Sequence, residues 1–289
     1  MESKMDQKPQ SQNPLNKYFR QPAIYLKLPS DGEFWPKDAI DMPVTGELPI
    51  YPLTTRDEVI LKTPDALMNG SGVVDVIQSC CPSIKNAWAM PSVDVDSVLI
   101  AIRIASYGHS MDFTTNCPHC SAENSYDKDL RDCLAAITMP DYHEPVFAHN
   151  LEIMIKPQAF FTSNKMNQIN FEEQKMLKAV EDVNLDPEVR NREIYNSMQR
   201  LIEIGLDNLT ASTEYIASVA DGEEVRDPKF IREFYANADS STVKLIQEKI
   251  GELSAKAGIP PFTVGCPECN NTYDVPVEFN YANFFDKGF

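Results

Sequence analysis

The stretches Cys117-Pro118-His119-Cys120 and Cys266-Pro267-Glu268-Cys269 decide the fold of this chain, although they lie far apart in its 289 residues. Each is a C-x-x-C turn, which places two sulfur atoms on one side of a tight knuckle. Two such knuckles together provide the four thiolates of a closed, tetrahedral zinc shell, which has no open position for a substrate. The sequence therefore predicts one structural Zn2+ per chain, with four ligands: Cys117, Cys120, Cys266 and Cys269.

The two knuckles also have similar surroundings. Phe113 and Phe262 each stand four residues before the first cysteine of a pair. A Tyr-Asp step follows each knuckle, at Tyr126 and at Tyr273, with offsets that differ by two residues. This pattern predicts two strand-knuckle-strand hairpins that clasp one ion, as a zinc ribbon split by a long insertion. Two alternatives stay open: a redox C-x-x-C pair, which normally opens a helix in a βαβ unit, and two separate, incomplete sites.

Composition restricts the class of protein. With 43% hydrophobic residues, the chain can build one large or two moderate globular domains. Acidic residues outnumber basic ones by 43 to 26, which gives a formal charge of −17. Because phosphate contacts come from Lys and Arg, this charge argues against nucleic-acid binding. The sequence contains neither a long apolar run nor an N-terminal signal pattern, so we expect no membrane span and synthesis in the cytosol.

Three cysteines remain outside the two knuckles, namely Cys80, Cys81 and Cys133. The adjacent pair lies near the end of an apolar helical stretch. In a reducing compartment, we expect buried free thiols there rather than a disulfide or a further metal ligand.

The pattern along the chain predicts an α+β fold in four parts. These are a mobile arm (residues 1–21), an α+β part with the first knuckle (22–157), a helical insertion (158–257), and the second knuckle with an aromatic tail (258–289). Strands are expected within 24–28, 46–52 and 151–155. Helices are expected from Thr54, where a hydroxyl cap precedes an acidic first turn, with a kink or break at Pro64. Further helices are expected at 73–81, 94–107, 171–183, 187–220, 227–238 and 240–257. Because the knuckles flank the insertion, its two ends must meet, and the metal would hold them together.

The chain ends in a segment with five aromatic residues among its last eleven. These rings could cover the core of the zinc ribbon itself. Alternatively, they could anchor the chain in a neighbouring subunit, since aromatic rings dominate interface energetics. The second hypothesis makes three residues candidates for partner binding: Phe284, Phe285 and Phe289.

Catalytic patterns are missing from the sequence. None of the four histidines has the spacing of a catalytic metal site, and His119 is expected to be an exposed knuckle residue. There is no nucleophile elbow, phosphate loop or dinucleotide fingerprint. The paired acids Glu172-Glu173 and Glu223-Glu224 are interpreted as solvated surface. We therefore expect neither enzymatic activity nor a small-molecule substrate.

Three further stretches carry a resemblance to a known family. They are Leu28-Pro29-Ser30-Asp31-Gly32-Glu33-Phe34-Trp35, Ile50-Tyr51-Pro52-Leu53-Thr54-Thr55-Arg56-Asp57-Glu58, and Ala101-Ile102-Arg103-Ile104-Ala105-Ser106-Tyr107-Gly108 leading into the first knuckle. The chain resembles the baseplate hub subunit and hub-assembly proteins of T-even-type contractile-tailed bacteriophages. The similarity covers residues 22–130 and resumes at the second knuckle and Asn283-Phe284-Phe285, whereas residues 158–257 carry no matching motif.

The resemblance implies a non-enzymatic virion or tail-assembly role, with other baseplate hub and tail proteins as partners. The protein would be assembled in the host cytoplasm and located in the tail baseplate. Two alternatives remain open. An assembly chaperone would bind a hub partner and be absent from mature particles, and a zinc-ribbon adaptor of a transcription or replication complex would need a basic face.

Overall fold

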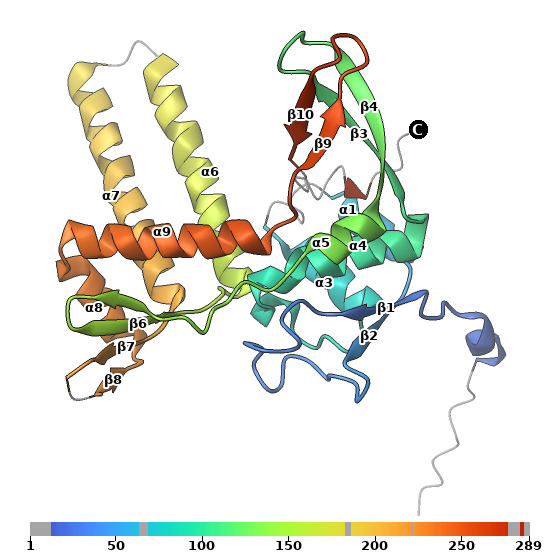
Figure 1. The fold of residues 1–289 in the computed structure, drawn as a ribbon, viewed down its shortest axis with the longest axis horizontal. Helices are drawn as coiled ribbons and strands as arrows, with labels where there is room; N and C mark the ends of the chain where they lie inside the picture. Colours follow the sequence, from blue (N-terminus) through green and yellow to red (C-terminus); the bar gives the residue numbers. More distant parts are fainter. Residues whose placement is uncertain (1–12, 64–68, 183–185, 221, 277–283, 286–289) are drawn as a thin grey trace, which may run out of the picture.

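The computed structural model describes residues 13–63, 69–182, 186–220, 222–276 and 284–285 (Figure 1). These residues form a mainly helical N-terminal body, a second body of helices and a small sheet, and a separate pair of β-hairpins. Each part has its own cluster of buried hydrophobic side chains. The expected mixture of helices with small antiparallel sheets is therefore confirmed.

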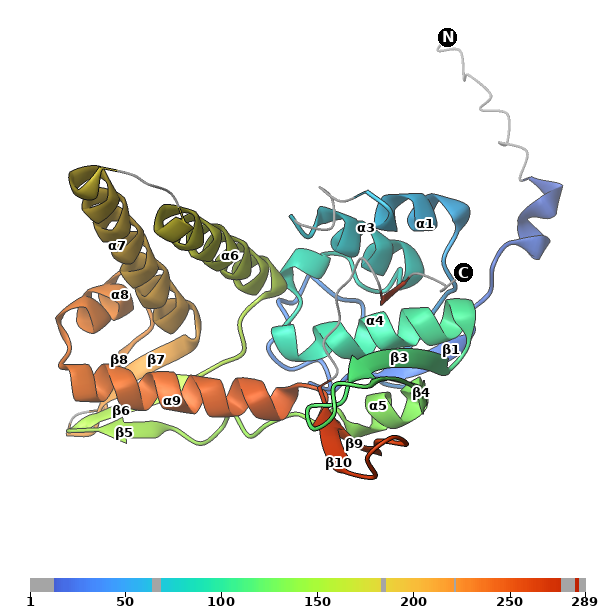
Figure 2. The same cartoon turned by 90° about the horizontal axis from the view of Figure 1, so that it is seen from above.

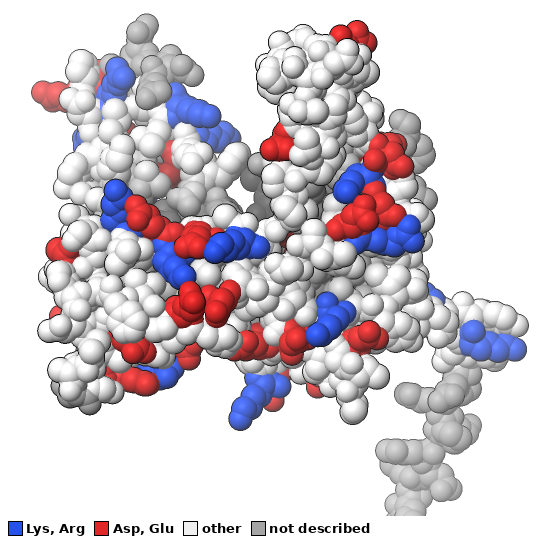
Figure 3. All heavy atoms as spheres, in the orientation of Figure 1, with Lys and Arg blue, Asp and Glu red and all other residues white. Residues whose placement is uncertain are grey.

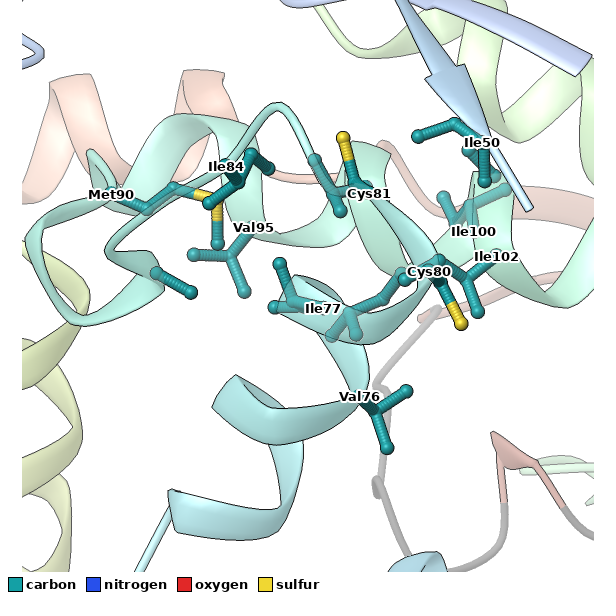
Figure 4. Close-up of a cluster of buried hydrophobic side chains, with 14 of the residues drawn as sticks. Ile50, Val76, Ile77, Cys80, Cys81, Ile84, Met90, Val95, Ile100 and Ile102 are labelled. Carbon is teal, nitrogen blue, oxygen red and sulfur yellow. The ribbon is translucent and has the colours of Figure 1, made fainter. Parts of the chain in front are cut away.

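Helix α4 is the centre of the N-terminal body, because its residues 97–103 are all buried. A helix that is apolar around its whole circumference must be surrounded by other elements. Figure 4 shows Ile100 and Ile102 of this helix facing Ile50 and Cys80 from its neighbours. Helix α4 spans Ser92–Tyr107. The surrounding elements are β1 (Ile24–Lys27), β2 (Glu47–Ile50), α1 (Thr55–Leu61), α3 (Ser71–Cys80), the 3-10 helix η2 (Ala87–Ala89) and α5 (Leu130–Ala136).

The signals that start and end these helices work as the sequence predicts. The Thr54 hydroxyl accepts from the backbone N–H of Asp57, and the Asp57 carboxylate accepts from that of Thr54, which completes a capping box. Gly108 follows α4 with φ +89°, a conformation that a side chain would strain. The expected break at Pro64 lies outside the described residues.

The buried carboxylate of Asp94 binds residues of the stretch 28–35, the first of the three stretches that resemble the phage family. Asp94, in the first turn of α4, is 0% exposed and accepts three hydrogen bonds. Its donors are the backbone N–H of Ser30 at 3.0 Å, the Ser30 hydroxyl at 2.5 Å and the Trp35 indole N–H at 2.7 Å. Burial raises the pKa of Asp94, and the bonds from Ser30 and Trp35 partly offset this rise. Residues 30–35 are thereby fixed to the central helix.

The same loop also contacts the second body. Phe34 has φ +65° and packs edge-on against Tyr142, with 5.7 Å between ring centroids. The neighbouring Glu33 carboxylate lies 3.4 Å from the His143 ring nitrogen, in an exposed pair. The loop therefore joins the core of the N-terminal body to the start of the second body.

The second body is organised around a four-stranded antiparallel sheet of order β5-β6-β7-β8. Helices α6 and α7 form a long antiparallel pair that projects from the sheet, and α9 crosses near the base of this pair (Figures 1 and 2). The elements are β5 (Val146–Ala148), β6 (Leu151–Ile155), α6 (Phe160–Asp182), α7 (Pro187–Ala211), β7 (Thr213–Ser218), β8 (Glu224–Val225), α8 (Pro228–Asn237) and α9 (Ser240–Ala257).

Two sequence predictions for this region are wrong. The helix expected over residues 187–220 ends at Ala211, and residues 213–218 form strand β7 instead. Pairing decides the outcome, because β7 lies between β6 and β8 and buries Thr213 and Ile216. The predicted insertion, residues 158–257, is thus not wholly helical. Its strands β7 and β8 belong to the same sheet as β6, which lies before residue 158 in the predicted N-terminal part. Helix α6 also begins at Phe160, eleven residues before its predicted start.

The predicted mobile arm, residues 1–21, is only partly within the described residues. Residues 1–12 lie outside the described part, and Pro14–Tyr18 form a 3-10 helix. Arg20 is anchored to the N-terminal body, where its guanidinium donates to the carbonyls of Pro52 and Ser79 and lies 3.3 Å from Asp57. A single arginine in a polar stretch gives no local signal for such a long-range contact.

Cys80 and Cys81 are buried free thiols, as predicted, and Cys133 is buried and free as well. The sulfurs of Cys80 and Cys81 point in different directions inside the core (Figure 4). Desolvation raises the pKa of Cys80 to about 12 and that of Cys81 to about 11, so both stay protonated and unreactive.

Two rings of the C-terminal segment belong to the N-terminal core. Phe284 and Phe285 are 2% and 6% exposed and contact each other edge-on. The Arg103 guanidinium lies 5.6 Å from the Phe284 ring and 5.5 Å from that of Tyr107. This burial favours the hypothesis that the rings cover the chain's own core, although it is the core around α4 and not that of the ribbon. Their role in binding a partner stays a prediction, and Phe289 lies outside the described residues.

Within the described ranges, no helix combines the length and apolar character that a bilayer span requires.

Replacing Asp94 with Ala should lower the free energy of unfolding by about 3 kcal/mol or more, because three buried donors lose their acceptor. Chemical denaturation monitored by circular dichroism would measure the loss. The matched control is Asp96→Ala on the same helix. Burial raises the pKa of Asp96 to about 6, so the free energy of unfolding falls as the pH rises from the unfolded-state pKa of about 4 to about 6. At pH 8 this loss is complete, so the removal of Asp96 should not destabilise the protein. Equal loss in both variants would contradict the network.

Phe284→Ala should lower the free energy of unfolding by about 3–5 kcal/mol, since a buried ring is removed and the cation–π contact with Arg103 is lost. Thermal melting of the full chain would measure this effect. Phe230, which is 60% exposed on α8, provides the control, and Phe230→Ala should melt almost like the unmodified protein. An unchanged melting temperature for Phe284→Ala, together with lost binding to baseplate proteins, would favour the anchor hypothesis instead.

Candidate metal centre

Two β-hairpins carry the four knuckle cysteines. Strands β3 (Ser110–Asn116) and β4 (Glu123–Asp129) form the first antiparallel pair, and β9 (Phe262–Gly265) and β10 (Thr272–Val275) form the second. The hairpins stand side by side, away from the helices of the N-terminal body (Figure 1). The first follows α4 directly and the second follows α9, so the chain between them leaves and returns to this point.

The two turns have the same backbone geometry. The N–H of Cys117 donates to the Ala122 carbonyl at 2.9 Å, and the N–H of Cys266 donates to the Asn271 carbonyl at the same distance. The residue after each second cysteine adopts a left-handed conformation, with φ +61° at Ser121 and +58° at Asn270. Such a conformation is uncommon outside glycine, and asparagine tolerates it better than serine. Its presence in both turns shows that the two knuckles are equivalent.

The four sulfur atoms lie within 4.8 Å of one another. Two contacts cross between the knuckles, Cys117 to Cys269 and Cys120 to Cys266, each at 3.7 Å. The first cysteine of each turn therefore faces the second cysteine of the other. Four sulfurs in such a cluster could bind one metal ion, so all four predicted ligands are brought together.

The four sulfurs differ in burial, and two of them accept hydrogen bonds from side-chain amides. Cys117 and Cys266 are buried, whereas Cys120 is exposed and Cys269 is half-buried. Side-chain amides of Asn124 and Asn271 donate to the sulfurs of Cys266 and Cys269 at 3.6 and 3.5 Å. Neither asparagine is predicted from the sequence, because a single amide near a knuckle carries no distinctive spacing.

The thiol of Cys266 has a lowered pKa. Desolvation raises this pKa, but hydrogen bonds from the backbone N–H groups of Cys269 and Glu268 and from neighbouring thiols outweigh it and bring the value to about 6. The Cys120 thiol shows the opposite shift: a backbone hydrogen bond from Ala122 lowers its pKa, but desolvation and hydrogen bonds with the three other cysteines outweigh this and raise the pKa to about 12. Without an ion, the four sulfurs therefore share protons, and a bound metal would displace them.

Aromatic side chains join the two hairpins below the knuckles. Phe113 and Phe262 pack edge-on with 5.4 Å between centroids, which confirms that these two residues occupy matching positions. The Tyr126 hydroxyl donates to the Gly265 carbonyl and lies 3.3 Å from the Tyr273 hydroxyl. The rings thus form a small core that fixes one hairpin against the other.

The two Tyr-Asp steps, however, are not equivalent positions. Phe113 pairs with Tyr126 across the first hairpin, and Phe262 pairs with Val275 across the second. The counterpart of Tyr273 in the first hairpin is Asn124, because each is the second residue of the strand that follows its knuckle. The two tyrosines, which differ by two residues in their distance from the preceding knuckle, therefore occupy different positions in their strands.

The geometry of the two knuckles argues against both alternatives to one shared site. Since the four sulfurs converge, the hypothesis of two separate, incomplete sites is not supported. The first cysteine of each pair follows a β-strand and does not open a helix, unlike a typical redox pair. His119 is exposed and lies outside the sulfur cluster.

Other titratable groups lie away from the knuckles. His109, His143 and His149 are exposed and lie within 4.0 Å of single carboxylates in separate places. The interpretation of Glu172-Glu173 as solvated surface is wrong for Glu173, which is 7% exposed between α6 and α7. Arg200 and the Ser197 hydroxyl donate to Glu173 and lower its pKa, so this carboxylate joins the two helices.

Comparison with known proteins assigns the chain to a family. A family model described as T4 bacteriophage base plate protein matches residues 24–286, which include both hairpins and the chain between them. Neither the curated proteins nor the solved structures compared with the chain gave a match. The family match covers nearly the whole chain and includes residues 158–257, for which the sequence alone gave no recognised motif. The chain therefore belongs to the family of T4 bacteriophage base plate proteins.

Proposed function

We propose that this protein is a structural component of the hub of a contractile-tail phage baseplate and that a structural zinc ion stabilises it. The observation that carries the proposal is the family match over residues 24–286, together with a closed cluster of four sulfurs. A closed cluster leaves no coordination position for a substrate, so the role is non-enzymatic assembly with other baseplate proteins of the virion tail.

Distances support zinc as the metal. A Zn–S bond of about 2.3 Å in a regular tetrahedron places neighbouring sulfurs about 3.8 Å apart. The two contacts between knuckles, at 3.7 Å, agree with this spacing. Thiolate ligands in a tetrahedral set favour zinc over magnesium or calcium, which prefer oxygen ligands.

Surface charge supports a protein partner over a nucleic acid. On the face in Figure 3, basic and acidic side chains are interspersed, without a broad basic area. With a net charge of −17, long-range attraction to phosphate is absent. The observations therefore favour protein–protein assembly over a transcription or replication adaptor.

Purified full-length protein should contain about one zinc ion per chain, measured by elemental analysis without chelators. Cys117→Ser and Cys266→Ser should each lose the ion and lower the melting temperature, because metal-binding energy contributes to folding. Cys120→Ser should also lose zinc, whereas Cys133→Ser should retain it and serves as the cysteine control. Metal-free protein with unchanged stability would contradict the zinc proposal.

Quantitative mass spectrometry of purified virions tests the baseplate role. A structural component should be present in mature particles in a fixed ratio to other baseplate proteins and should remain after washing in high salt. Its presence in assembly intermediates with complete absence from mature particles would identify an assembly chaperone instead. Salt-sensitive, submicromolar binding of the isolated protein to DNA would favour the adaptor.

A further inference from the structure

We infer that a cavity between the N-terminal body and the second body binds a primary ammonium group on an aliphatic stem, with the Asp96 carboxylate as its counter-ion. The cavity has a volume of about 350 Å3, within the range of small-molecule pockets. Asp96 lines it from near the start of α4. Most of the other lining residues belong to β6, α6, α7 and α9 or to the segments next to these elements.

The Asp96 carboxylate has no partner of its own. It forms neither a hydrogen bond nor an ion pair with any residue in the described ranges, and its oxygen atoms are not enclosed by protein. Asp94, two residues earlier on the same helix, accepts three hydrogen bonds. A carboxylate that is largely removed from water without donors is costly, and an incoming cation would offset this cost.

No cation in the described part of the chain neutralises Asp96. Three of the residues that line the cavity are titratable: Asp96, Tyr142 and Lys156. Burial raises the pKa of Tyr142 to about 12, so this phenol stays neutral. Burial also raises the pKa of Asp96 to about 6, and no positive charge offsets this rise. The Lys156 ammonium group is therefore not the counter-ion of Asp96.

The other lining residues fit both ends of an alkylammonium ion. A primary ammonium group donates three hydrogen bonds and accepts none. In addition to Asp96, the side chains of Asn170 and Ser254 offer oxygen atoms, and neither forms a hydrogen bond with a described residue. Val93 and Met166 line the same cavity and provide apolar surface for the stem.

The cavity is less suited to a bare metal ion. Ca2+ takes about six to eight oxygen ligands, and Mg2+ requires a nearly ideal octahedron. Asp96 is the only carboxylate among the lining residues of the cavity. An organic cation requires fewer ligands and occupies more of the volume. The net charge of −17 attracts such a cation at long range.

Ligand-observed NMR titration of the full-length protein with n-butylammonium chloride tests the inference. The uncharged comparison ligand is 1-butanol, and about 150 mM NaCl screens the charges on the surface. At about pH 7.5 the ammonium ion should bind at least about tenfold more tightly than the alcohol, because only the ion forms charge-assisted hydrogen bonds with Asp96. Asp96→Asn should weaken its binding at least about tenfold.

The pH dependence of binding provides a second readout. An alkylammonium ion with a pKa of about 10 keeps its proton throughout the tested range, whereas Asp96 loses its charge as the pH falls below about 6. The affinity of the unmodified protein should therefore fall about tenfold between about pH 7.5 and about pH 5. In Asp96→Asn the affinity should not change with pH.

Asp75→Asn is the matched control, because Asp75 is exposed on α3 outside the cavity. This variant should bind the ammonium ion like the unmodified protein, and melting temperatures verify that both variants are folded. Equal binding of the ion and the alcohol, no binding of the ion, or the same loss in Asp75→Asn would overturn the inference. Displacement of the ion by Ca2+ at equal ionic strength would assign the cavity to a metal and would also overturn it.

The ammonium group has two possible sources, a lysine side chain of a neighbouring protein and a free aliphatic amine. Titrations with Nα-acetyl-lysine N-methylamide and with 1,4-diaminobutane distinguish them. Tighter binding of the blocked lysine agrees with a side chain, whereas tighter binding of the diamine agrees with a free amine. These measurements depend neither on the zinc content nor on the presence of the protein in virions, so they can fail while the proposed structural role holds.

Discussion

Loop closure between the two knuckles is the constraint on which the rest of the structure depends. For a loop of this length, bringing the ends together costs about 4 kcal/mol in chain entropy beyond a constant. The cost grows slowly with length, so a whole body of helices and strands can lie between the two hairpins. A metal bound by the four sulfurs would offset this cost, because it can bind only when the ends meet.

The knuckles are not the only contact that closes the chain. Strand β6 lies before α6 and α7 and pairs with β7 after them, so the sheet closes the projecting helix pair at its base. Phe284 and Phe285 return from the second hairpin to the core around α4. The excursion is therefore closed at three places by sulfur, by backbone pairing and by apolar packing. The core of the N-terminal body is therefore completed by residues from the far end of the described chain.

Sequence reasoning succeeded where one local pattern determines the structure. The C-x-x-C spacing, the Thr54 cap and the long apolar pattern of α4 each predicted the observed element. It failed where distant pairing decides: residues 213–218 continue a helical pattern but become a strand because β6 and β8 lie on either side. Arg20, Asn124 and Glu173 also act through partners far along the chain. Their roles depend on positions that only the folded chain brings together.

The equivalence of the two knuckles has a consequence for the history of the chain. Each turn repeats the other's hydrogen bonds and left-handed residue, and the crossed sulfur contacts are reciprocal, as in a two-fold symmetric dimer. Two copies of one hairpin around a shared ion would produce this arrangement. The centre is thus the arrangement expected from duplication of a short C-x-x-C hairpin. The two hairpins differ at the equivalent strand positions Tyr126 and Val275, which makes the aromatic core between them asymmetric.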